Sequence, residues 1–96
     1  MSRLPLAIYK IADHSMEPKL YHGDYIIVNQ WHRKFKIGDI VVFKHPEQQI
    51  YVVKRVRKID GTFLHVFGDN AMQSKDSRHF GPIERNVVVG KLVAKI

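Results

Sequence analysis

The chain is rich in β-branched aliphatic residues, and this feature constrains its fold most. Val and Ile together number 21 of its 96 residues, whereas Leu and Ala together number 9. β-branched side chains lose rotamer freedom in a helix and pack well on a pleated sheet. The composition therefore favours strands over helices. A chain of this length is enough for one compact domain, so we expect a single domain over residues 1–96.

Turn signals divide the chain into short apolar runs. They include Gly-Asp pairs at 23–24 and 38–39 and an Asp-Gly pair at 60–61. This spacing is typical of a mostly β protein that folds as a small antiparallel barrel or sandwich. No window shows the apolar period of a long helix, so we expect at most one or two helical turns, at 16–20 and 71–76. The expected strands lie at 6–12, 24–29, 39–44, 49–58, 62–67 and 87–96.

Composition excludes several classes of site. The absence of Cys rules out disulfides, thiolate zinc sites and a Cys nucleophile. The six His residues show no spacing of a known metal box, so no metal or cofactor is expected. No segment reaches the roughly 18–20 apolar residues that a membrane helix needs. Pro5 and Lys10 interrupt the first apolar run, so we expect a soluble protein without a removed leader. No pattern indicates an oligomeric state.

Lys54 stands out in the expected strand at 49–58. Side chains alternate faces along a strand, so Lys54 shares one face with Ile50, Val52 and Val56. A lysine in such a position commonly covers apolar surface with its stem and keeps its amine in water. The alternative is an amine held in a dry pocket. Desolvation lowers the pKa of a lysine, and a neutral amine can act as a general base.

A general base needs a nucleophile, and Ser15 is the best candidate. It follows the first expected strand, within the sequence Asp13-His14-Ser15-Met16. Serine at such a junction commonly caps or shapes a turn. It can also project its hydroxyl outward, with nearby backbone N–H groups facing a developing oxyanion. The residue alone leaves both interpretations open.

Several segments, in order along the chain, resemble the type I signal peptidases, the S26 family of serine–lysine proteases. Ser-Met-Glu-Pro-Lys-Leu at 15–20, with Gly-Asp at 23–24, resembles the family's nucleophile box. Val-Lys-Arg-Val at 53–56 resembles its general-base box. Three segments resemble the family's third box, namely Gly-Asp-Asn at 68–70, Ser-Lys-Asp-Ser-Arg at 74–78 and Phe-Gly-Pro at 80–82. Gly-Asp-Ile-Val-Val-Phe at 38–43 and Gly-Lys at 90–91 resemble two of its strands.

The resemblance implies a serine endopeptidase on the mostly β catalytic core of that family. Ser15 would be the nucleophile, and its backbone N–H would bind the oxyanion. Lys54 would be the general base, in a recognised variant of the triad arrangement. Ser74 would orient the lysine amine. The residues that would support the site are Asp76 and Arg78, which pair in the family, together with Gly68, Asp69 and Asn70.

The resemblance also implies how a substrate binds. In this family an extended peptide adds as a strand between the strand before the nucleophile and the strand before the lysine. Main-chain hydrogen bonds supply affinity in such an arrangement. An extended peptide or protein is therefore the expected partner, and no nucleic acid is expected. The flanking residues would be Leu6, Ile8 and Lys10 on one side and Tyr51 and Val53 on the other.

Two departures from the family pattern matter. The family often has Ser or Gly two residues before the nucleophile, whereas this chain has Asp13. A carboxylate that faces an oxyanion would repel it, so we expect Asp13 to point elsewhere. The chain also shows no membrane-spanning leader and no large inserted β domain. It is most like the short soluble proteases that mature nickel-type superoxide dismutase. That likeness predicts a cytoplasmic bacterial enzyme that removes a leader or pro-segment from a partner protein.

Two other hypotheses fit parts of the sequence. The formal net charge of +7 and the alternation of Phe63, His65 and Phe67 along one strand fit a basic β-barrel that binds nucleic acid and has no protease activity. Self-cleavage, as in the related repressor-type proteases, needs an upstream domain with the scissile bond. Only fourteen residues precede Ser15, so we expect cleavage of another protein.

Overall fold

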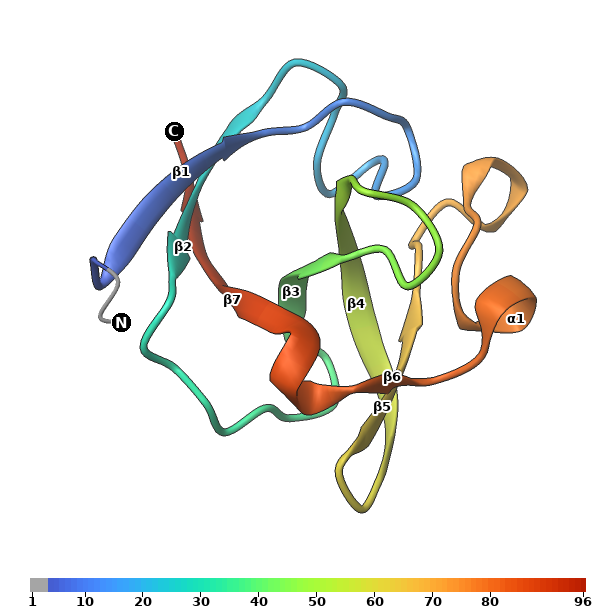
Figure 1. Ribbon diagram of the computed structural model, residues 1–96. Helices are drawn as coiled ribbons and strands as arrows, with labels where there is room; N and C mark the ends of the chain where they lie inside the picture. Colours follow the sequence, from blue (N-terminus) through green and yellow to red (C-terminus); the bar gives the residue numbers. More distant parts are fainter. Residues whose placement is uncertain (1–3) are drawn as a thin grey trace.

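The structure, a computed structural model, describes residues 4–96 and is built on one curled antiparallel sheet. Neighbouring strands lie in the order β1-β2-β7-β3-β4-β5-β6. The sheet forms a half-barrel in which β1 comes round toward β4 (Figure 1). The strands are β1 (Leu6–Lys10), β2 (Tyr25–Asn29), β3 (Ile40–Lys44), β4 (Tyr51–Asp60), β5 (Phe63–Phe67), β6 (Ile83–Glu84) and β7 (Val88–Lys95).

The mostly β fold predicted from the sequence is confirmed. Every expected strand is present, with ends shifted by one or two residues, and the short β6 is added by pairing with β5. At 16–20, where a single helical turn is expected, Leu20 N–H donates to Met16 O at 2.9 Å, which is the hydrogen bond of one helical turn, and no longer helix forms because Pro18 has no N–H. The helical elements of the described residues are η1 (Ala71–Gln73), α1 (Ser77–Phe80) and η2 (Arg85–Val87).

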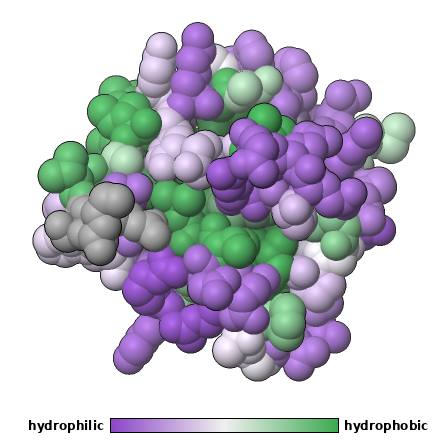
Figure 2. Space-filling model, in the orientation of Figure 1, coloured by the Kyte–Doolittle hydropathy of each residue, from purple (hydrophilic) through white to green (hydrophobic). Residues whose placement is uncertain are grey.

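β3 is buried on both faces, which explains its unbroken apolar run. Ile40 and Val42 belong to one cluster of buried residues, and Val41 and Phe43 belong to a second cluster. Successive side chains of a strand point to opposite faces, so a strand with a core on each side reads as continuously apolar. On the face shown in Figure 2, hydrophobic residues are visible in the middle, between hydrophilic ones. β3 is therefore the central support of the fold.

Two Gly-Asp turns of the same form lead into β2 and β3. Gly23 and Gly38 have φ angles of +91° and +98°, a region in which glycine carries no steric penalty. In each turn the carboxylate of the next residue accepts a backbone N–H from three positions earlier. These bonds are Tyr21 N–H to Asp24 Oδ2 and Lys36 N–H to Asp39 Oδ2, both at 2.8 Å. The first turn also closes the loop that carries Ser15.

We predict that the core of β2 is sensitive to the loss of one methyl group. Ile26 is fully buried, so Ile26→Val should lower the free energy of unfolding by about 1 kcal/mol. Ile37 is 67% exposed and makes the matched control. Ile37→Val should change the free energy of unfolding by less than about 0.5 kcal/mol. Urea denaturation followed by fluorescence measures both values. Equal effects for the two variants would contradict this description of the core.

Candidate functional site

Ser15 lies in the connection between β1 and β2, and its loop is anchored in the core. Met16 and Leu20 are each 1% exposed and pack in the same cluster as Ile26. Ile11 N–H donates to Asp24 O at 2.8 Å and closes the base of the loop. Ser15 itself is 1% exposed. The loop therefore holds a serine in a fixed and nearly water-free position.

A second segment, which follows β5, holds the serine loop from the other side. Asn70 N–H donates to Ser15 O at 2.8 Å, and Asn70 Nδ2 donates to His14 O at 3.1 Å. His14 itself is exposed, and its ring pairs with Glu17. The Gly-Asp-Asn segment at 68–70 and the serine segment, which are far apart in sequence, therefore form one contiguous structure.

Gly68 permits the close approach of these segments. A Cβ atom at this position would lie 2.7 Å from Ser15 O and would overlap Ser74 Oγ. Only a residue without a side chain fits there, because such distances are well inside van der Waals contact. The side chain of Ser74 and the carbonyl oxygen of Ser15 therefore both crowd the same face of one glycine. The structure brings together these two serines, which the sequence separates by 59 positions.

Lys54 is buried near the middle of β4, with a side chain that is 2% exposed. It lies opposite Val41 of β3 in the strand register. Burial lowers the pKa of its ammonium group, because leaving water disfavours the charged form. The negative charges of Asp13 and Asp76 oppose that shift. The commoner interpretation of this lysine, with an amine in water, is therefore wrong, and the dry-pocket alternative describes its surroundings.

Asp76 is a fully buried carboxylate that organises the third segment of the site. Ser74 Oγ donates to its Oδ2 at 2.7 Å, and Gly68 N–H donates to the same oxygen at 2.9 Å. Arg78 donates from Nε to Oδ1 at 2.9 Å and from Nη2 to Oδ2 at 2.6 Å. Burial alone would raise the pKa of Asp76, but these hydrogen bonds outweigh burial and hold the pKa far below its ordinary range. The ion pair between Asp76 and Arg78 is thus partly buried and is not a surface ion pair.

Asp13 corrects one expectation from the sequence. Its Oδ1 accepts the Ser15 backbone N–H at 3.1 Å and the Ser15 hydroxyl at 3.0 Å, so the carboxylate points at the serine and not elsewhere. An aspartate two positions before a serine can readily form this local hydrogen-bonded turn. Among residues 4–96, the Ser15 hydroxyl is bonded to Asp13 and not to Lys54.

Arg55 is a residue of the site that the sequence analysis missed. Its Nε and Nη2 donate to the two oxygens of Asp69 at 2.9 and 2.8 Å. This bidentate ion pair ties β4 to the segment that follows β5. The alternation of side chains along β4 could not reveal this role, because a strand pattern does not indicate a partner 14 positions away. The sequence offered one signal of this pairing, namely Asp69, which the family resemblance had already placed in the third box.

The free edges of two strands face each other beside this site. β1 is the first strand of the sheet, so one of its edges has no strand partner within residues 4–96. On one side of β4, Tyr51–Arg55 pair with β3. On its other side, β4 pairs with β5 only from Arg55 onward, so in the described chain the first residues of β4 have a free edge there. The rings of Tyr9 and Tyr51, 5.7 Å apart, connect the two edges. A narrow hollow of about 40 Å³ between them is lined by residues 10–13 and 51–53 and by Met16.

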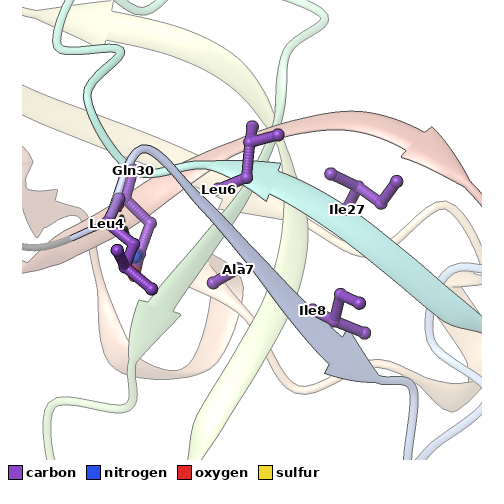
Figure 3. Close-up of a pocket in the computed structure, with 6 residues that line it drawn as sticks. All are labelled: Leu4, Leu6, Ala7, Ile8, Ile27 and Gln30. Carbon is purple, nitrogen blue, oxygen red and sulfur yellow. Dashed lines mark hydrogen bonds between the residues drawn. The ribbon is translucent and has the colours of Figure 1, made fainter.

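Two further hollows lie on the surface of the described residues. A polar cleft of about 290 Å³ adjoins the site and includes Asp13, Lys54, His45 and Lys75 in its wall. A hollow of about 590 Å³ lies elsewhere, on β1 and β2 (Figure 3). Its lining is apolar except for one glutamine and contains none of the titratable residues described above. The residues that line it are Leu4, Leu6, Ala7, Ile8, Ile27 and Gln30. Of the expected flanking residues, Lys10, Tyr51 and Val53 thus line the narrow hollow, and Leu6 and Ile8 line the apolar one.

The aromatic residues of β5 form a poor platform for nucleic acid bases. Phe63 is half-exposed, but the guanidinium of Arg78 lies 5.1 Å above the ring of Phe67. Base stacking needs free aromatic faces. Arg78 therefore competes for the surface that the nucleic-acid hypothesis requires.

Comparison with known sequences agrees with this arrangement. The sequence profile described as "Signal peptidase, peptidase S26" matches residues 2–62 and 57–96, which together cover almost the whole chain. The chain belongs to the signal peptidase family.

Two curated members of the family show the degree of similarity. The mitochondrial inner membrane protease subunit 2 of Schizosaccharomyces pombe is 26% identical over 97 residues, covering 81% of this chain. This chain spans 54% of the length of that relative. Signal peptidase I V of Bacillus subtilis is 26% identical over 136 residues, covering 85% of this chain and 80% of the relative. In the described part of this chain, no helix has the length and apolar character needed to cross a membrane.

We predict that the hydrogen-bonded charge of Asp76 stabilises the fold above about pH 4. A carboxyl group with a depressed folded pKa contributes stability that is lost as pH falls below the unfolded value of about 3.9. Asp76→Asn should lower the free energy of unfolding by about 2–3 kcal/mol near pH 7. The difference from wild type should then narrow as pH falls. Urea denaturation between about pH 3 and 7 measures it.

The matched control is Asp60→Asn, which removes an exposed carboxylate at the end of β4. It should leave both the stability and its pH dependence close to wild type. A constant difference between Asp76→Asn and wild type across the acid range would show that the charge of Asp76 is not what stabilises this segment.

Proposed function

We propose that this protein is a serine endopeptidase in which Ser15 is the nucleophile and Lys54 is the general base. The observation that carries the proposal is the burial of Lys54, which is 2% exposed and has a lowered pKa. A buried lysine is rare and unfavourable unless it has a use, because desolvating an ammonium group is costly. Membership of a peptidase family supports the same assignment.

The proposed reaction uses the Ser15 hydroxyl, its backbone N–H and the Lys54 amine. The neutral amine accepts the hydroxyl proton as Ser15 Oγ attacks the carbonyl carbon. The Ser15 N–H binds the oxyanion of the tetrahedral intermediate. The ammonium of Lys54 then passes its proton to the leaving amine, and the C–N bond breaks. A water molecule, deprotonated by the same amine, hydrolyses the acyl-enzyme and restores Ser15.

The third segment supplies positioning in this proposal. Ser74 is 7% exposed and lies against Gly68, next to the serine loop. Its hydroxyl donates to Asp76, so an oxygen lone pair is left to orient the Lys54 amine. Arg78 keeps Asp76 charged and in place. Ser74, Asp76 and Arg78 are thus assigned to holding the geometry, and Ser15 and Lys54 to the chemistry.

The proposed substrate is an extended segment of another protein that adds a strand between β1 and β4. The unpaired edges of these strands offer main-chain donors and acceptors on both sides. The hollow of about 40 Å³ between them suits a small side chain. We propose a leader or pro-segment as the cleaved element. The precursor of a nickel-type superoxide dismutase is one candidate, because the chain resembles the short proteases that mature that enzyme.

We predict that cleavage depends on Ser15 and Lys54. Ser15→Ala and Lys54→Met should each lower kcat/KM by about three orders of magnitude or more, because each removes a reacting group. Ser74→Ala should lower it by about tenfold to a hundredfold through misplacement of the amine. The assay uses purified protein and internally quenched peptides with Ala or Gly before the scissile bond, with products identified by mass spectrometry.

The matched control is Lys58→Met, four residues along the same strand but exposed. It should retain wild-type activity, and circular dichroism should show that every variant is folded. Wild-type activity in folded Ser15→Ala or Lys54→Met protein would overturn the assignment.

We predict an alkaline-rising pH profile with a midpoint below the ordinary lysine pKa of about 10.4. The base must be uncharged to act, so kcat/KM should rise as pH passes through the lowered pKa of Lys54. Initial rates between about pH 5 and 11 give the midpoint. A midpoint at or above the ordinary value would mean that the active amine is solvated and is not Lys54.

A further inference from the structure

One oxygen atom of Asp13 engages two groups of Ser15 at once. Its Oδ1 accepts the Ser15 backbone N–H at 3.1 Å and the Ser15 hydroxyl at 3.0 Å. These are the groups that the proposed reaction needs to have free. The N–H has to bind an oxyanion, and the hydroxyl has to donate its proton to Lys54. In the arrangement seen here, both are already used by a carboxylate.

We propose that Asp13 restrains the enzyme: its carboxylate holds Ser15 in a resting arrangement, and the entering peptide has to displace it. This inference rests on the proposed function and adds a residue that controls it. A negative charge at the oxyanion position disfavours the tetrahedral intermediate, because like charges repel strongly away from water. Release of Asp13 therefore has to precede the attack.

The surroundings of Asp13 allow such a displacement. Its side chain is exposed, in contrast to that of Ser15, so the carboxylate regains water when it leaves the serine. Asp13 also lines both the narrow hollow between β1 and β4 and the adjoining polar cleft. A peptide strand laid along residues 10–13 would press on this residue first. On the cleft side, Lys54, Lys75 and His45 face the space into which the carboxylate can turn.

Asp13 has a second effect, on Lys54. Its negative charge favours the ammonium form of that lysine and so opposes the effect of burial on the pKa. A carboxylate that stays beside Ser15 therefore both occupies the nucleophile and disfavours the neutral base. Both effects end when the side chain moves away.

The test compares Asp13→Ala and Asp13→Asn with wild type and with Asp60→Asn, which removes an exposed carboxylate at the end of β4. Asp13→Ala should bind a peptide aldehyde, which forms a tetrahedral adduct with serine, about fivefold more tightly, and kcat/KM should rise by a similar factor. Asp13→Asn keeps a neutral acceptor oxygen, so its gain should be smaller. Both variants should shift the rising limb of the pH profile to lower pH, and Asp60→Asn should not.

Two results would overturn the inference. Weaker aldehyde binding and slower cleavage by folded Asp13→Ala would mean that Asp13 positions Ser15 for attack. An unchanged pKa of Lys54 in Asp13→Asn, measured by NMR titration of the lysine side chain, would exclude the electrostatic effect even without a peptide substrate. Failure of the proposed function is recognised separately, because it would leave cleavage intact in Ser15→Ala.

Discussion

Removing one ammonium group from water is the constraint on which the candidate site depends. An isolated charged amine in an apolar interior is costly, and the group responds by losing its proton more easily. Lys54 is held in this position by the sheet itself, since it lies opposite Val41 of a strand that is buried on both faces. Side chains on such a strand cannot move without disrupting the core. The fold therefore keeps Lys54 buried, which favours the neutral form of its amine.

Two carboxylates near this lysine behave differently because their surroundings differ. Asp76 is fully buried and bonded by Ser74, Gly68 and Arg78, so it stays charged and acts as a fixed structural element. Asp13 is exposed, and within residues 4–96 its carboxylate is hydrogen-bonded through its local turn with Ser15. The first contributes rigidity to the site, and the second is free to change its partner. The same chemical group is thus fixed at Asp76, whereas at Asp13 it has the exposure that the proposed restraint of Ser15 requires.

The half-barrel also explains where a peptide can bind. An unpaired strand edge is normally a liability, because it offers a template for unwanted strand pairing. Here the open edges of β1 and of the first half of β4 are turned toward each other beside Ser15. A strand added there would satisfy both edges and pass the buried serine. The curl of the sheet brings these two edges to the place where the proposed peptide strand would bind.

The sequence alone determined the strands, because β-branched runs between glycine and aspartate turns are a local property of the chain. It also singled out Ser15, Lys54 and Ser74, since their spacing follows a recognisable family order. Only the tertiary structure decided that Lys54 is dry, that Gly68 brings Ser15 and Ser74 to one point, and that Arg55 is paired with Asp69. The orientation of Asp13 was predicted wrongly, because electrostatic repulsion by an oxyanion acts only during the reaction, whereas the hydrogen bonds to Ser15 act in the resting protein. Burial, the close approach at Gly68 and the pairing of Arg55 with Asp69 depend on segments distant in the chain, and a linear pattern does not contain them.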